Sequence, residues 1–458
     1  MSEHVKDIQL NPVKSTFMLS IPIIILYFLD SLYAVGDIYW VNGLGTTAII
    51  CMGYISNFII TLHYLGDGIG RSCNILISNA FGAQEIEKTE KYAEQGLLLI
   101  VVLSIIIPIV SIPLIEPICV MAGIGEYTDM IFAYIAPCLG FAIIIMINNF
   151  FCVILGSEGD TKRAAIIVTA GNILNIILDP ILIFNLNLGM FGAAISTIIG
   201  GLLSFLLFVY IYSIKKDTQV KIRLKGFRLD FGILKEIVVL AIPIIIVGVI
   251  LTFLGIIITY SLELYASPIA VFTYIIILNV QSTVFTPTQG IMKALCIVSG
   301  HLNGAERYIE LRNTIRKVFS ISLGLGILIA LVLAIFHNPI IGIFSTENVV
   351  LDEVRNILYF VVIYIISFPI IMGCSYVFLG IEKSTYTLMF LVLNILTLIF
   401  FIGLFNHFLG LSSAGVYLSI ILSNAIEAVG MLVVLKRFFD SKISTSRMEN
   451  ESDIHIGN

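Results

Sequence analysis

Long apolar runs separated by short polar segments dominate the whole chain. A run of about 20 apolar residues can cross the hydrocarbon core of a bilayer as an α-helix. Twelve such runs lie roughly at residues 17–40, 47–78, 93–116, 129–155, 164–186, 190–213, 235–262, 268–299, 316–337, 356–380, 385–408 and 412–435. Hydrophobic residues make up 59% of the 458 positions and charged residues 12%, which excludes an ordinary soluble domain. The sequence therefore predicts an all-α membrane protein with twelve transmembrane helices.

The second half of the chain repeats the first at a nearly constant distance. Five landmarks recur in order: Ser20-Ile21-Pro22 as Ala241-Ile242-Pro243, Gly82-Ala83 as Gly304-Ala305, Leu155-Gly156 as Leu379-Gly380, Asn172-Ile173-Leu174 as Asn394-Ile395-Leu396, and Gly192 as Gly415. Their offsets are 221, 222, 224, 222 and 223 residues. Each repeat has an even number of predicted helices, six, so both repeats enter the membrane from the same side and are parallel. Two like halves around a central pathway are typical of secondary transporters.

Polar segments divide the chain into five parts. We expect an N-terminal tail over 1–14, a first six-helix lobe over 15–213, a linker over 214–234, a second six-helix lobe over 235–439 and a polar, disordered tail over 440–458.

The basic residues predict the orientation of the chain. With the N-terminus inside, 22 of the 25 Lys and Arg residues fall on that side. Because Lys and Arg are concentrated in cytoplasmic loops, we expect a multi-pass protein of the cytoplasmic membrane with both termini in the cytoplasm. The basic linker segment 215–223 is interpreted as a topology signal near the membrane and not as a nucleic-acid patch.

Acidic residues at membrane depth are concentrated in the first repeat. Asp37 lies on the first predicted helix, Asn175 and Asp179 lie four residues apart on the fifth, and Thr197 on the sixth can face them. An Asp at a helix centre costs roughly 2.5 to 3.5 kcal/mol on insertion scales, so a functional role is expected. All four residues offer oxygen ligands, which suit a hard cation such as Na+. Two carboxylates held close together can equally share a proton, so H+ is the alternative coupling ion.

Two further residues extend this polar group. Asp30 shares a face of the first helix with the aspartate seven residues later, and Asn172 begins the polar stripe of the fifth helix, so both are candidate accessory residues. At an offset of 222 the second repeat has Thr259 and Phe401 in place of the two candidate site aspartates. This asymmetry predicts that the first lobe handles the ion. The opposing interpretation is that the two asparagines only hold neighbouring helices together.

Four other charged residues lie within predicted helices. Asp67 and Arg71 are spaced i to i+4 and can form an ion pair, and Lys293 stands at the position of Arg71 in the second repeat. Glu427 lies in the last predicted helix. For Asp67 and Arg71 we keep two interpretations open, an ion pair that makes their burial tolerable or a contact to a substrate. For Glu427 the alternatives are an interfacial position or a role in binding a cationic substrate.

Four ordered segments resemble the MATE (multidrug and toxic compound extrusion) transporters. Their sequences are AVGDIYWVNGLG at 34–45, SNAFGA at 78–83, NILNIILDPI at 172–181 and LGMFGAA at 188–194. The resemblance extends over residues 12–439. It implies a V-shaped pair of six-helix lobes with a central cavity, alternating between outward and inward openings, and export of organic cations driven by Na+ or H+.

The resemblance also implies roles for individual residues. The cation site of the first lobe would be formed by Asp37, Asn175, Asp179 and Thr197. Pro22 would be the proline at which the first helix bends when that site is occupied. One branch of the family carries a second acidic site in the other lobe, where this chain has Leu251 and Phe253 instead of a glutamate.

The expected function is therefore export of organic cations and drugs by antiport, with Na+ or H+ as coupling ion and no cofactor. Its expected partners are small organic cations and the lipid bilayer, without nucleic acid, and we expect a monomer. An enzyme is disfavoured because the sequence has neither an HExxH nor a GxSxG pattern. The alternative is a flippase for lipid-linked saccharides or other lipids, which Arg71 and Lys293 would favour if they line a central cavity.

Overall fold

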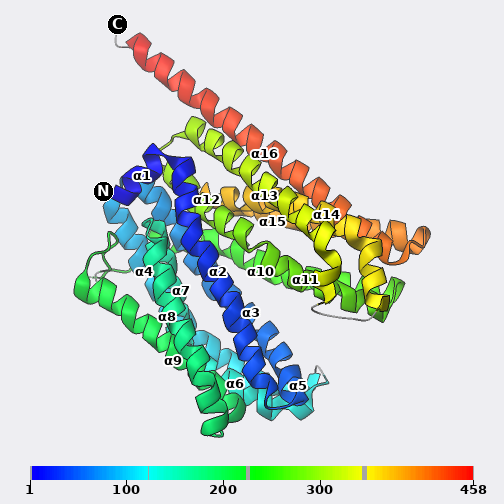
Figure 1. Cartoon of the computed structure of the whole chain (residues 1–458). Coiled ribbons are helices and arrows are strands. Elements are labelled where there is room, and N and C mark those ends of the chain that lie inside the picture. The colour runs from blue at the N-terminus through cyan, green and yellow to red at the C-terminus, as the bar shows by residue number, and fades with distance from the viewer. Residues whose placement is uncertain (1–2, 122, 223–226, 343–347, 457–458) are drawn as a thin grey trace. The chain divides into compact units, whose positions relative to one another are not determined.

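The computed structural model describes residues 3–121, 123–222, 227–342 and 348–456 and is almost entirely helical (Figure 1). The helices of the first half are α1 (Glu3–Leu10), α2 (Pro12–Asn42), α3 (Thr46–Gly82), α4 (Ile86–Ser111), α5 (Ile115–Met121), α6 (Thr128–Gly140), α7 (Ala142–Ser157), α8 (Thr161–Pro180) and α9 (Gly189–Val209). Those of the second half are α10 (Phe231–Tyr265), α11 (Pro268–Val284), α12 (Thr286–Gly304), α13 (Tyr308–Gly342), α14 (Asn348–Gly380), α15 (Ser384–Ile402) and α16 (Ser412–Ile456).

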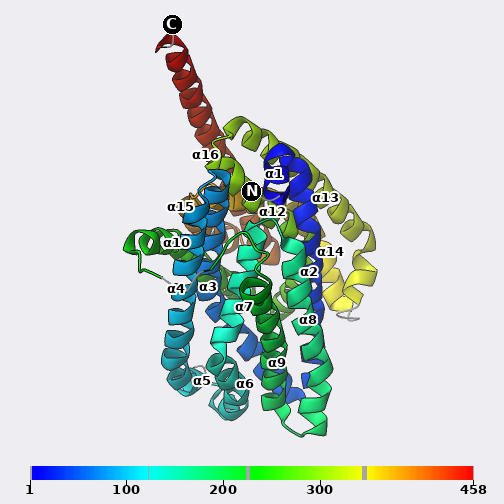
Figure 2. The same cartoon turned by 90° about the vertical axis from the view of Figure 1, so that its left-hand side faces the viewer.

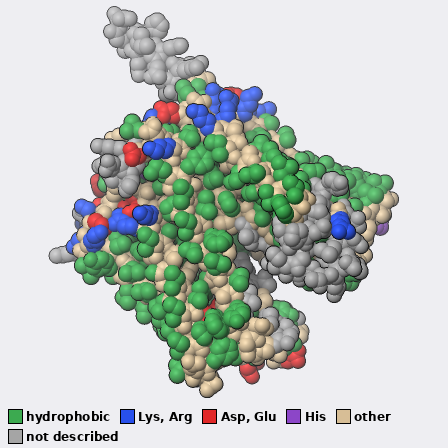
Figure 3. Space-filling model, viewed as in Figure 1, with side chains coloured by type: hydrophobic (Ala, Val, Ile, Leu, Met, Phe, Trp, Pro, Cys, Tyr) green, Lys and Arg blue, Asp and Glu red, His purple; other side chains and the backbone are tan. Residues whose placement is uncertain are grey.

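Helical backbone covers every apolar run that the sequence predicts to cross the membrane. In the described part of the chain, nine helices are long and apolar enough to span a bilayer, or ten if the bent pair α6–α7 is one span. Large hydrophobic side chains such as Ile105, Ile109 and Val110 of α4 are exposed, as a lipid-facing helix requires. Figure 3 shows hydrophobic side chains, in green, over much of the visible surface. The predicted all-α membrane fold is confirmed.

The chain forms two compact units. The first comprises Met1–Ile8 and Met18–Ile245, and the second comprises Gln9–Phe17 and Ile246–Asn458. The division between them falls inside α10, and the start of α2 belongs with the second unit. In the first unit, α5 and α6 lie at one end of the bundle formed by α3, α4, α7, α8 and α9 (Figure 2).

The two ends of the chain are more helical than the sequence indicates. The segment expected as an N-terminal tail contains α1 and the first turn of α2. At the other end, α16 continues without a break to Ile456. The segment expected as a polar tail over 440–458 is therefore helical as far as Ile456, continuous with the last apolar helix.

The backbone of the two halves carries the same turns at the same spacing. Left-handed residues, with positive φ, recur at offsets of 222 or 223 in four pairs: Gln84 and Glu306, Gly159 and Glu382, Asn187 and Gly410, Gly189 and Ser412. Helices α8 and α15 both continue into a π-helical turn, at Ile181–Asn185 and Gly403–Phe408. Such agreement between independent turns shows that the sequence repeat is also a structural repeat.

Candidate cation site in the first unit

Two glycines allow α8 and α9 to cross closely. A Cβ atom added to Gly200 of α9 would lie 2.5 Å from the carbonyl oxygen of Gly171 on α8 and 3.0 Å from Cβ of Asn175. Small residues at such a crossing let two membrane helices approach until their backbones touch. The crossing therefore brings the polar stripe of α8 against α9.

The buried face of α8 carries the predicted polar residues. Gly171, Asn175 and Asp179 follow one another at a spacing of four and are all buried, and Asp179 is 0% exposed. The Asn175 side-chain amide donates to Ser196 Oγ and to Thr197 Oγ1, both at 3.2 Å. Ser196 in turn donates to Asp179 Oδ1. Three of the four predicted site residues thus share one hydrogen-bonded group.

Helix α2 supplies the second carboxylate. Asp37 is 5% exposed and accepts a hydrogen bond from the Tyr134 hydroxyl of α6, at 3.3 Å between oxygens. One turn earlier, the Tyr33 hydroxyl lies 3.4 Å from Thr197 Oγ1. Residues of α2, α6, α8 and α9 therefore meet at one place.

The carboxyl groups of Asp37 and Asp179 interact directly with each other. Within the described residues, Asp37 Oδ1, Asp179 Oδ2 and Asn175 Oδ1 are buried oxygens without a hydrogen-bond donor. Two adjacent carboxylates cannot both stay ionised at low cost away from water, since their repulsion adds to the loss of hydration. A proton shared between them, or a small cation held by these oxygens, removes that cost. The site can therefore hold H+ or a hard cation such as Na+.

The accessory residues bind each other. The Asn172 side-chain amide donates to Asp30 Oδ1 at 2.7 Å. Asn394, the counterpart of Asn172 in the repeat, donates to Glu427 Oε2 at 2.9 Å. The duplicated asparagine thus holds a carboxylate in each unit, Asp30 from α2 in the first and Glu427 from α16 in the second.

The remaining sequence candidates lie apart from this group along the chain. Arg71 and Asp67 form an ion pair on α3, with 2.6 Å between Nε and Oδ2. Lys293 lies half-buried on α12, and Pro22 lies inside the continuous helix α2. The ion pair agrees with the interpretation in which neighbouring charges make each other's burial tolerable.

Sequence reasoning missed three residues of the site, namely Tyr33, Tyr134 and Ser196. Two of them had a signal, since Tyr33 lies one turn before Asp37 and Ser196 lies beside Thr197. Nothing in the sequence indicated Tyr134, because its place depends on the packing of α6 against α2 and α9.

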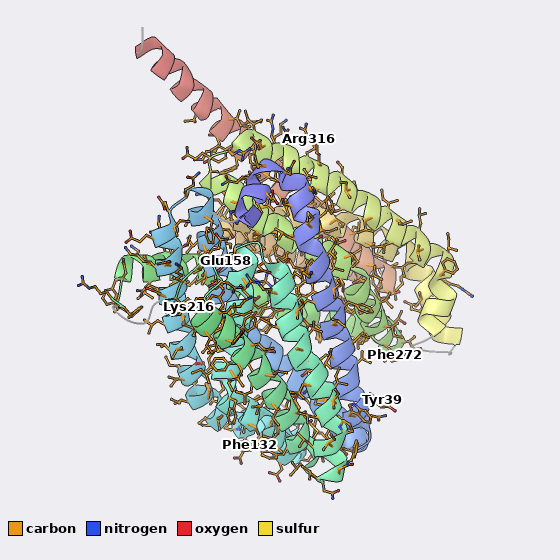
Figure 4. The ribbon with its side chains drawn as sticks, turned by 60° about the vertical axis from the view of Figure 1, so that its left-hand side comes forward. Tyr39, Phe132, Glu158, Lys216, Phe272 and Arg316 are labelled. Atoms are coloured by element: carbon orange, nitrogen blue, oxygen red, sulfur yellow. The ribbon has the colours of Figure 1, made fainter. Side chains whose placement is uncertain are left out.

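The site lies toward one end of the first unit. Figure 4 shows Tyr39, two residues beyond Asp37, at the end of the unit opposite Glu158 and Lys216. Lys216 belongs to the basic linker. The carboxylate pair therefore lies nearer to the end of the first unit opposite the linker.

Known proteins match this chain over most of its length. The MatE family model matches residues 22–181 and 243–404, one match in each repeat. The multidrug export protein MepA of Staphylococcus aureus (strain MRSA252) is 23% identical over 382 residues, 81% of each chain. The probable multidrug resistance protein YoeA of Bacillus subtilis (strain 168) is 24% identical over 312 residues, 67% of each chain.

Solved structures share the fold. An outward-facing multidrug resistance MATE family transporter superposes with a TM-score of 0.92 at 24% identity, covering 96% of this chain and 99% of the other. A transporter from Pyrococcus furiosus, described as having a binding pocket of reverse polarity, gives 0.90 at 24% identity, with the same coverage.

Proposed function

This chain belongs to the MatE family of multidrug efflux transporters, and we propose that it is an antiporter that exports organic cations in exchange for Na+ or H+. The observation that carries the proposal is the buried pair Asp37 and Asp179, whose facing carboxyl groups have oxygens without a donor. A pair of this kind has little use in a helix bundle unless it takes up and releases a positive charge.

The mechanism requires that the coupling ion bind two conformations with different affinity. Occupation of the carboxylate pair removes the repulsion between Asp37 on α2 and Asp179 on α8, so α2 packs differently against α8 and α9 when the site is filled. Only such a difference in affinity can shift a conformational equilibrium. We propose that the ion favours the conformation that has released its organic cation, and that Pro22 is where α2 bends.

Mutation of the pair tests the proposal. In proteoliposomes that contain a fluorescent organic cation, Asp37→Asn and Asp179→Asn should each reduce export driven by an imposed Na+ or pH gradient to the background of empty vesicles. Asn keeps the size of the side chain and removes its charge, so folding should be retained. Imposing the two gradients separately identifies the coupling ion.

Glu126→Gln is the matched control, because it removes an exposed carboxylate of the same unit and should export at the wild-type rate. Gradient-driven export in both Asp variants would exclude the pair as the coupling site. Translocation of a labelled lipid by the wild type without export of the cation would favour the flippase alternative.

A further inference from the structure

The second unit contains a cavity of about 310 Å³ between α10, α11, α14, α15 and α16. Its lining includes four aromatic residues, the aromatic wall, namely Tyr274, Phe360, Tyr364 and Tyr417, and two hydrogen-bonded amides, the amide wall, namely Asn394 and Asn424. Small-molecule sites occupy roughly 300 to 1,000 Å³ and are mostly apolar with a few polar groups. This cavity has both features.

A buried carboxylate stands directly behind the amide wall. Glu427 is 5% exposed and accepts from the Asn394 side-chain amide, whose other hydrogen bond goes to Asn424 Oδ1 at 2.8 Å. Among the described residues, no Lys or Arg forms an ion pair with Glu427. Both donated hydrogens of Asn394 are used, so its oxygen is the amide atom that can still accept a hydrogen bond, and the Glu427 carboxyl lies directly behind the amide.

The aromatic wall has a polar group without a partner. Tyr417 is 5% exposed, and its hydroxyl has no hydrogen-bond partner in the described structure, although buried tyrosine hydroxyls usually find one. Its ring stacks with Phe360 at 6.3 Å between centroids and meets Tyr274 edge-on at 6.4 Å. The rings of Tyr417, Phe360 and Tyr274 thus form a continuous aromatic surface against which a flat molecule can pack.

We propose that this cavity binds a singly charged organic cation, with its aromatic body against Tyr274, Phe360 and Tyr417 and its N–H group at Asn394, backed by Glu427. Aromatic faces attract cations, and a cation bound in the cavity would favour the ionised form of Glu427 behind the amide. A bare metal ion is a poor fit, because most of the wall is carbon and the cavity is far larger than one ion. The inference rests on the proposed export function and assigns a binding site for its substrate class.

Equilibrium binding without any gradient tests the site separately from transport. The full chain is placed in nanodiscs of uncharged phosphatidylcholine, and fluorescence anisotropy follows proflavine, a flat aromatic cation, and acridone, a neutral molecule of similar shape. Glu427→Gln should weaken proflavine binding at least tenfold and change acridone binding less than twofold. Gly255→Phe should abolish binding of both, because Gly255 lines the cavity and a Cβ there meets no atom within 4 Å, so the ring would occupy the cavity.

Glu263→Gln is the control for charge, since it removes an exposed carboxylate of α10, and it should bind like the wild type. Wild-type affinity for proflavine in Glu427→Gln and Gly255→Phe, or no saturable binding by the wild type, would overturn the site. Asp37→Asn separates the two proposals, because it should retain proflavine binding while losing coupled export. Loss of binding in Glu427→Gln together with intact coupling in Asp37→Asn would support the cavity and refute the proposed coupling site.

Discussion

At the scale of single residues, Glu158 combines burial with a position outside the membrane-spanning helices. It follows α7, is 2% exposed, and accepts the backbone N–H groups of Gln219 at 2.9 Å and Val220 at 3.1 Å. Burial raises the pKa of its carboxyl from 4.5 to about 7, although the two N–H groups oppose the rise. The Glu158 carboxyl thus binds the backbone of the linker and has a pKa near neutrality.

The pH dependence of stability should report this residue. A folded-state pKa above the unfolded value means that stabilisation is fully present below about pH 4.5 and is lost as the pH rises through 7. The rise in pKa corresponds to about 3 kcal/mol at most. As the pH is raised from 5 to 8, the midpoint temperature of thermal unfolding in detergent should therefore fall by more in the wild type than in Glu158→Gln. Parallel curves for the two proteins would show that Glu158 does not titrate in this range, and Glu126→Gln should follow the wild type.

Residue spacing predicted part of the candidate cation site. Asn175 and Asp179 were recognisable because a four-residue spacing in a helix puts both on one face, whatever that face contacts. Tyr134 was not, because its contact with Asp37 depends on how α6 is rotated against α2. Glu158 carried no signal at all, since a glutamate after a helix is ordinarily solvated.

At the scale of elements, the crossing of α8 and α9 sets the geometry of the site. Asn175 lies one turn from Gly171, and Ser196 lies one turn from Gly200. The hydrogen bond between Asn175 and Ser196 therefore forms one turn away from the point where the two backbones come closest. Any side chain at Gly200 must move α8 away.

Gly200→Ala should therefore weaken coupling through geometry alone. The added methyl group meets the Gly171 carbonyl and Asn175, and overpacking of this kind typically costs about 1 to 3 kcal/mol. We expect a lower unfolding midpoint and at least tenfold slower gradient-driven export. Gly53→Ala on α3 is the control, because a Cβ there meets nothing within 4 Å. Equal export rates for the Gly200 and Gly53 variants would mean that the crossing tolerates separation.

Helix positions were largely predictable, whereas helix breaks were not. A backbone in lipid must satisfy its own hydrogen bonds, so each apolar run had to be helical. The breaks at Phe141 and Phe285 interrupt runs that are apolar on both sides, and the first bends α6 against α7 by 57°. Hydrophobicity does not distinguish a straight span from a bent one.

At the scale of the whole molecule, the orientation in the membrane is a prediction from basic residues. It is tested with Lys216→Cys in the linker and Glu126→Cys at the opposite end of the first unit, each labelled by a maleimide that cannot cross membranes. In intact cells Glu126→Cys should react and Lys216→Cys should react only after permeabilisation, because Lys and Arg stay in the cytoplasm. The parent protein gives the background, since its cysteines are buried except for half-buried Cys152. The reverse labelling pattern would place the termini outside.

The left-handed residues occupy matching positions in both halves, although Glu382 stands at the position of Gly159 and Ser412 at the position of Gly189. The backbone conformation at these positions is thus the same in both halves, although the residue types differ. Duplication and fusion of an ancestral gene for half this length leave such a record. Before fusion, two copies of one gene product had to associate, so every substitution was present in both copies. Once the two copies were joined, each position could change in one half alone, which permits Asp37 and Asp179 in the first half opposite Thr259 and Phe401 in the second.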